Sequence, residues 1–138
     1  MDASLDQRLR TLRILHLVFL STILLYAVVG EMVPHELQDV GVFHKALIVV
    51  LVFQIGLITV FRTRWIAPQV ELLERDRNDA AALQRWHGGH IACYALAESV
   101  ALLGLVLRFL GGTFVQAAPF YAVGFVLLAF LAPRNPGQ

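Results

Sequence analysis

The sequence predicts an all-α integral membrane protein: four transmembrane helices forming two antiparallel hairpins, with the N and C termini in the cytoplasm. Its 138 residues are 58% hydrophobic and 15% charged, whereas a soluble domain is about half apolar and a quarter charged. The apolar residues gather in four runs, 14–33, 42–61, 88–110 and 114–132, each about as long as a helix that crosses a bilayer. Because unpaired backbone groups are costly in lipid, these runs predict a single membrane domain covering residues 1–138.

The basic residues predict how this domain is oriented. Of the 11 lysines and arginines, only Lys45 and Arg108 lie on the side of the membrane where the second and fourth runs begin. The other nine precede the first run, lie between the second and third runs, or follow the fourth. Since cytoplasmic loops are enriched in Lys and Arg, both termini and the segment 62–87 should be cytoplasmic. The first run is longer than the apolar core of a secretory signal, so we expect an uncleaved span.

The connections between the runs follow from their turn and cap residues. The segment 31–40 is a short outer turn, and 62–87 is the long cytoplasmic loop. Pro68 should end the second helix just beyond the membrane. Asp79 should cap the N-terminus of the third helix, since aspartate is a favoured N-cap residue. Gly111-Gly112 predicts a tight turn between the third and fourth helices.

Glu98 is an acidic residue inside the apolar third run, and it is the main candidate for a functional role. It lies near the middle of that run, and at 1.5 Å per residue this places it near the bilayer midplane. A carboxyl group there must be protonated, paired or in contact with water. It is therefore a candidate proton- or ion-binding residue, or else a hydrogen-bonding residue that holds helices together. Thr22 and Gln54 lie at a depth similar to that of Glu98 in the first and second runs, and Tyr94 lies one turn before it in the third. These three residues are its possible polar partners.

The same run carries a stripe of small residues at helical spacing. Such a stripe lets helices approach closely in a membrane. Whether it packs within the chain or against another subunit is left open by the sequence. Cys93 is the single cysteine, so no intramolecular disulfide can form. The stripe consists of Gly89, Cys93, Ala97, Ala101 and Gly104.

Two histidines suggest a redox alternative. His16 and His90 lie at matching depths near the cytoplasmic ends of the first and third runs, so they are geometrically possible axial ligands of a b-type haem. The competing interpretation is that both are polar residues at headgroup level. No C-x-x-C-H or H-E-x-x-H pattern is present, and the scattered histidines make no metal site.

Residues 95–107, ALAESVALLGLVL, resemble the acid-bearing helix of the proteolipid c subunit of rotary ATP synthases. That resemblance implies that Glu98 is the ion-binding acid and that Ala97, Ala101 and Gly104 are packing residues around it. In that family the acid lies on the second helix of a hairpin, whereas Glu98 lies on the first helix of the second hairpin. The whole chain resembles a group of small four-helix bacterial membrane proteins, which implies a bacterial cytoplasmic membrane but no activity.

No nucleophile triad, Gly-rich phosphate loop or basic nucleic-acid patch is present. The chain is therefore expected to be non-enzymatic, an accessory or structural subunit that packs with itself or with other membrane subunits in the bilayer. Neither a cofactor nor nucleic acid is expected. One alternative is translocation of protons, ions or small cations by Glu98, since small multidrug exporters also have four spans and one membrane acid. A second is a b-haem or quinone redox protein that uses His16 and His90.

Overall fold

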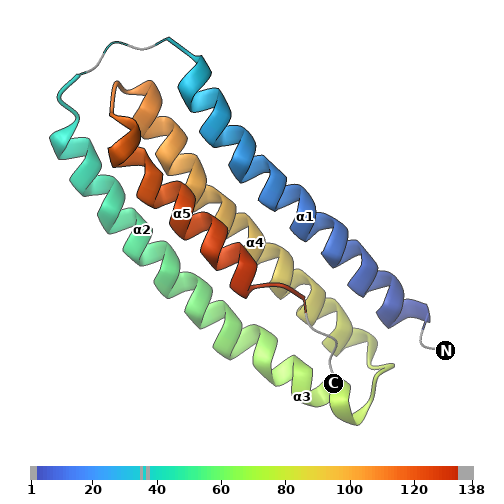
Figure 1. Ribbon diagram of the computed structural model, residues 1–138. Coiled ribbons are helices and arrows are strands. Elements are labelled where there is room, and N and C mark those ends of the chain that lie inside the picture. The colour runs from blue at the N-terminus through green and yellow to red at the C-terminus, as the bar shows by residue number, and fades with distance from the viewer. Residues whose placement is uncertain (1–2, 35, 37, 134–138) are drawn as a thin grey trace.

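The computed structural model describes residues 3–34, 36 and 38–133, and their regular secondary structure is entirely helical. The elements are arranged side by side as an elongated bundle (Figure 1). In order they are α1 (Ala3–Met32), α2 (Gly41–Phe61), the π-helical turn η1 (Arg62–Ile66), α3 (Ala67–Arg75), α4 (Ala80–Phe109) and α5 (Phe114–Phe130). Since α2, η1 and α3 follow one another without a break, the bundle consists of four helical rods. The prediction of an all-α fold with four helices is confirmed.

Helix α4 is the centre of the bundle. It packs against α1, α2, α3, η1 and α5, whereas α1 and α2 lie on opposite sides of the α4–α5 pair (Figure 1). Helices α4 and α5 run antiparallel and are joined by a short turn. The first two helices follow each other in the chain but do not pack closely along their length. The N-terminal and C-terminal halves are therefore not equivalent in their packing.

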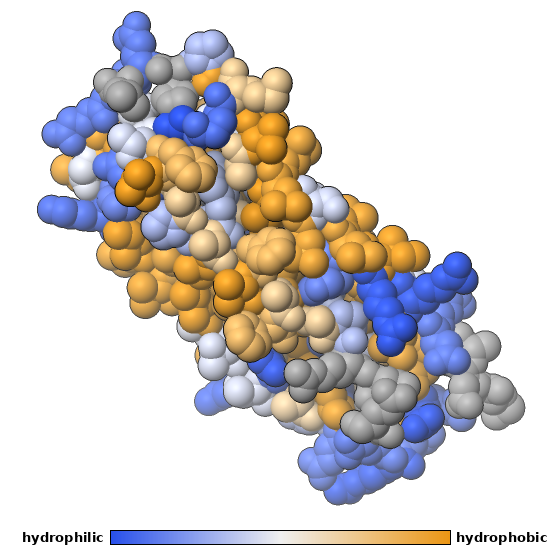
Figure 2. All heavy atoms as spheres, viewed as in Figure 1, coloured by the Kyte–Doolittle hydropathy of each residue, from blue (hydrophilic) through white to orange (hydrophobic). Residues whose placement is uncertain are grey.

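Three of the rods are long and apolar enough to cross a membrane. They are Leu5–Met32, Gly41–Arg75 and Ala80–Phe109, while α5 is a shorter apolar helix of 17 residues. On the face seen in Figure 2, hydrophobic side chains form a broad band across the middle of the molecule, and hydrophilic side chains gather toward its two ends. This distribution is consistent with an integral membrane protein.

The two ends of the bundle differ in what they contain. One end, here called the arginine end, holds the start of α1, the η1–α3 segment and the start of α4 (Figure 1). The other, here called the turn end, holds the described residues between α1 and α2 and the Gly111-Gly112 turn. There the backbone N–H of Gln38 donates to the carbonyl of Gly111 at 3.1 Å. Gly111 has a φ of 92°, a conformation that favours glycine, and the predicted tight turn is confirmed.

The prediction that Pro68 ends the second helix is wrong. The rod continues to Arg75, with Pro68 in the first turn of α3. Proline lacks an N–H and its ring crowds the carbonyl four residues earlier, which normally breaks a helix. Here the π-helical turn η1 ends two residues before the proline, and the N–H of Ala67 bonds to the carbonyl of Arg62, five residues back. This wider turn accommodates the proline. Within the segment 62–87, residues 62–75 continue the second rod, and residues 80–87 form the start of α4, as the Asp79 cap predicts.

The predicted cap of α4 is confirmed. One carboxylate oxygen of Asp79 accepts hydrogen bonds from the backbone N–H groups of Ala81 and Ala82, at 2.9 and 3.0 Å. These are two of the donors that a helix N-terminus leaves without intrahelical partners. The cap fixes where α4 begins, and thus the register of every residue along it.

Candidate functional site

Glu98 lies half-buried on α4 and is bonded to α1. Its Oε1 atom accepts a hydrogen bond from the hydroxyl group of Tyr26 at 2.9 Å. Tyr26 was not among the expected partners, although the sequence held a signal for it. It lies twelve residues into the first run and Glu98 ten residues into the third, so the two are at similar depth. The acid therefore takes part in a contact between two helices.

The three expected partners of Glu98 have other environments. The hydroxyl of Thr22 donates to the carbonyl one turn earlier in α1, at 2.9 Å. Gln54 of α2 reaches the neighbouring residue instead: its Nε2 donates to the hydroxyl of Ser99 at 2.7 Å. The hydroxyl of Tyr94 is buried and has no hydrogen-bond partner in the described part of the chain. Gln54 thus ties α2 to α4 one residue away from the acid.

A third polar contact to α4 lies at the turn end, and the sequence did not predict it. Arg108 is 5% exposed, and its Nε lies 2.8 Å from Oε1 of Glu31 on α1. That N–H is not aligned for a hydrogen bond, so the contact is an ion pair. The Nη1 group of Arg108 donates a hydrogen bond to the carbonyl of Gly112 at 2.6 Å. The buried guanidinium is thus neutralised by α1 and bonded to the α4–α5 turn.

These contacts have one feature in common. Each joins a polar residue of α4 to a neighbouring helix: Glu98 to Tyr26, Ser99 to Gln54, and Arg108 to Glu31. In a bilayer, polar pairs of this kind hold helices together at about 0.6 to 2 kcal/mol each. Chemically, the arrangement stabilises the position of α4 between α1 and α2.

No family model, curated protein or solved structure matches this chain.

The two histidines of the redox alternative are brought together near the arginine end. Both imidazole rings contact the ring of Tyr94, with centroid distances of 5.5 Å for His16 and 5.9 Å for His90. The ring centroids of His90 and Trp86 are 4.9 Å apart. Both histidines are buried and both Nδ1 atoms lack a partner in the described residues. The tyrosine ring packs against both imidazoles, so the cluster as it stands is an aromatic contact between α1 and α4.

Within residues 3–34, 36 and 38–133, no three histidine, cysteine, aspartate or glutamate side chains gather in a way that could hold a metal ion. Cys93 is a free, fully buried thiol.

The small-residue stripe of α4 faces other parts of the same chain. A Cβ atom on Gly104 would lie 3.0 Å from Phe120 Cβ on α5, and one on Gly89 would lie 2.8 Å from Ile66 Cγ1 of η1. Gly124 of α5 sits directly against the middle of the stripe. The stripe therefore allows close approach within the bundle. Its members, all buried, are Gly89, Cys93, Ala97, Ala101 and Gly104.

Proposed function

We propose that this protein is a non-enzymatic integral membrane protein that acts as an accessory or structural subunit of a membrane assembly. The observation that carries the proposal is that Glu98, the acid expected near the bilayer midplane, is bonded to Tyr26 of the adjacent helix. Its neighbour Ser99 is bonded to Gln54 of another helix. Both contacts support a packing role for the polar residues of α4.

The surface that we assign to partner subunits is the outer face of α2. Ile58 is the one buried residue of this helix, all of which is described. Val52, Gly56 and Val60 follow at intervals of four on its exposed side, and nothing lies within 4 Å of a Cβ placed on Gly56. A small residue between two branched ones lets a second helix approach closely. We infer that another transmembrane helix packs along this face.

We also infer that α5 spans the bilayer beside the three longer rods, and that the arginine end faces the cytoplasm of a bacterial cell. The positive-inside rule supports this orientation, because Arg8, Arg10 and Arg13 of α1 lie at the same end as η1 and α3. A thiol reagent that cannot cross membranes tests it. A cysteine at Gln7 should be labelled only after the cells are opened, and a cysteine at Asp39 in intact cells; the reverse pattern would disprove the orientation.

Cross-linking in the native membrane tests the assembly face. In a Cys93→Ser background, Gly56→Cys should give a cross-linked product of higher mass. Leu24→Cys, at an exposed position of α1, is the matched control and should give much less. Equal yields from both positions, or none from Gly56→Cys, would contradict the assignment. Native mass spectrometry of the gently extracted protein should then identify the partner chains, and a lone monomer would refute the proposed role.

A second candidate function is proton or ion translocation by Glu98. It is favoured by one observation: the carboxyl group is only half-buried and Tyr26 is its one hydrogen-bond donor in the described structure. Glu98→Gln separates the two functions. Glutamine still accepts the tyrosine hydrogen bond through its amide oxygen but cannot carry a proton. An intact assembly with unchanged proton flux in vesicles supports the packing role, and loss of flux in an intact assembly supports translocation.

A further inference from the structure

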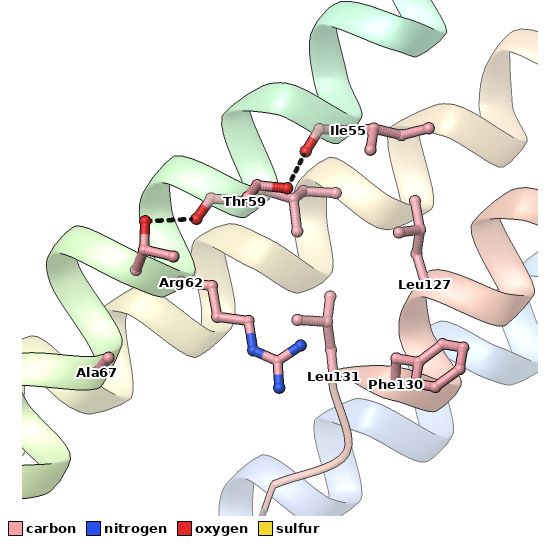
Figure 3. Close-up of a pocket in the computed structure, with 9 residues that line it drawn as sticks. Ile55, Thr59, Arg62, Ala67, Leu127, Phe130 and Leu131 are labelled. Carbon is pink, nitrogen blue, oxygen red and sulfur yellow. Dashed lines mark hydrogen bonds between the residues drawn. The ribbon is translucent and has the colours of Figure 1, made fainter.

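A pocket of about 420 Å³ opens between α2 and the end of α5. It exists because α5 ends at Phe130, whereas the neighbouring rod continues through η1 and α3 to Arg75. Figure 3 shows the Arg62 side chain reaching from η1 into this space, toward Leu131. The volume is in the range of about 300 to 1,000 Å³ that is typical of ligand pockets.

The walls of the pocket are mostly apolar, and their polar side-chain groups are that guanidinium and two threonine hydroxyl groups. Ile55, Leu127 and Phe130 contribute hydrocarbon. The hydroxyl groups of Thr59 and Thr63 point back along the helix and donate to the carbonyls one turn earlier, each at 2.9 Å (Figure 3). The threonines therefore present little free hydrogen-bonding capacity to the pocket.

Arg62 itself is not neutralised by the protein. Its guanidinium forms neither an ion pair nor a hydrogen bond with any described residue, whereas Arg75 pairs with Glu71 and Arg108 with Glu31. Arginine offers five N–H donors in a planar fork that matches the oxygens of a phosphate group. The pocket thus combines an unused phosphate-binding side chain with an apolar cleft.

The depth of these groups matches that of a phospholipid. Helix α2 has 21 residues before Arg62, which at 1.5 Å each is about 30 Å, the thickness of the hydrocarbon core. Arg62 therefore lies at headgroup level if α2 crosses the bilayer. Ile55 lies two turns deeper, about 10 Å into the hydrocarbon. The cationic and apolar parts of the pocket are separated along the membrane normal as they are in a lipid molecule.

We propose that this pocket binds one anionic phospholipid. The Arg62 guanidinium pairs with the headgroup phosphate, and an acyl chain lies against Ile55, Leu127 and Phe130. Basic pockets between transmembrane helices on the cytoplasmic side are the places where anionic headgroups bind. The inference goes beyond the proposed function, since it requires insertion in a bilayer but not a role as a subunit.

Lipid binding to the delipidated, detergent-solubilised protein tests the proposal. Phosphatidylglycerol and phosphatidylcholine with identical acyl chains are titrated and the bound fraction is read by native mass spectrometry. Phosphatidylglycerol should bind more tightly, and Arg62→Gln should weaken its binding about tenfold, as expected for losing a charged hydrogen bond. Arg13→Gln is the matched control, because it removes an exposed arginine next to another apolar run. It should change binding less than twofold.

Further arms make the proposal refutable in each of its parts. Thr59→Trp fills the pocket from an exposed position and keeps Arg62, so it should also weaken binding of phosphatidylglycerol; unchanged binding would contradict the acyl-chain site. Equal affinity for the two lipids would overturn the preference for an anionic phospholipid. Equal losses in Arg62→Gln and Arg13→Gln would overturn the contact of Arg62 with the headgroup. Displacement of the lipid by millimolar inorganic phosphate would show that the site takes free phosphate instead.

Discussion

Gly124→Ala is the substitution whose effect on the bundle is most directly calculable from the structure. Gly124 lies on α5 where that helix meets α4. A Cβ atom there would lie 2.9 Å from the carbonyl oxygen of Ala97, 3.0 Å from Ala101 Cβ and 3.2 Å from the backbone nitrogen of Ala101. Two of these atoms belong to the α4 backbone, so no side-chain rotation can relieve the overlap.

The size of the effect follows from how far the helices must move. Ordinary van der Waals contact of a Cβ begins at 3.4 Å, so α5 has to move away by about 0.5 Å, and α4 cannot yield because α1 packs on it as well. Forcing an extra methyl group into such a contact costs about 1 to 3 kcal/mol. Gly56→Ala is the matched control. Nothing lies within 4 Å of its Cβ, so the stability should be unchanged or rise by up to about 1 kcal/mol, because alanine favours the helix.

The protein contains its own probe for this experiment. Cys93 is the single cysteine and is fully buried on α4, so a thiol reagent reaches it only when the bundle opens. A loss of 1 to 3 kcal/mol corresponds to labelling about 5- to 150-fold faster in Gly124→Ala than in the unsubstituted protein. Gly56→Ala should label no faster than the unsubstituted protein. If the two glycine variants label at the same rate, the close contact between α4 and α5 is refuted.

Three further substitutions test the polar contacts of α4, each by the midpoint of thermal unfolding followed by circular dichroism. Tyr94→Phe should leave the midpoint unchanged or raise it, because it removes a buried hydroxyl that has no partner; a clear decrease would reveal a partner outside the described residues. Tyr26→Phe should lower stability by about 1 kcal/mol, since Glu98 loses its donor, and an unchanged midpoint would contradict that contact. Glu31→Ala should lower stability by about 1 to 3 kcal/mol, because Arg108 stays buried without its carboxylate, and an unchanged midpoint would contradict that ion pair.

The features that could be predicted from sequence are those fixed by neighbouring residues. The apolar runs predicted the helices, Asp79 predicted the start of α4, and Gly111 predicted the turn into α5. The prediction made from Pro68, that the second helix ends there, was wrong. The local preference of proline is to end a helix, but here a π-helical turn accommodates it, and that turn packs through Ile66 against Gly89 of α4. A contact between distant segments cannot be read from the proline itself.

The partner of Glu98 was missed for a different reason. Counting residues gives the depth of a side chain in a span but not the rotation of the helix about its own axis. Thr22 and Tyr26 are one turn apart on α1, and depth alone did not distinguish them. To predict the contact of Glu31 with Arg108, one would have to know that α1 and α4 are neighbours. The sequence contained both charges but not the arrangement that brings them together.

The two ends of the bundle use their arginines differently, and this difference bears on where partners bind. At the turn end, Arg108 is buried and satisfied by Glu31 and Gly112, so it contributes to the fold and offers nothing to a ligand. At the arginine end, Arg62 is exposed beside an apolar pocket and pairs with no described residue. A buried, paired arginine is costly to separate from its carboxylate, whereas an exposed, unpaired arginine is available to anionic ligands. We therefore expect anionic ligands at the arginine end and, under the proposed function, an apolar partner helix along α2.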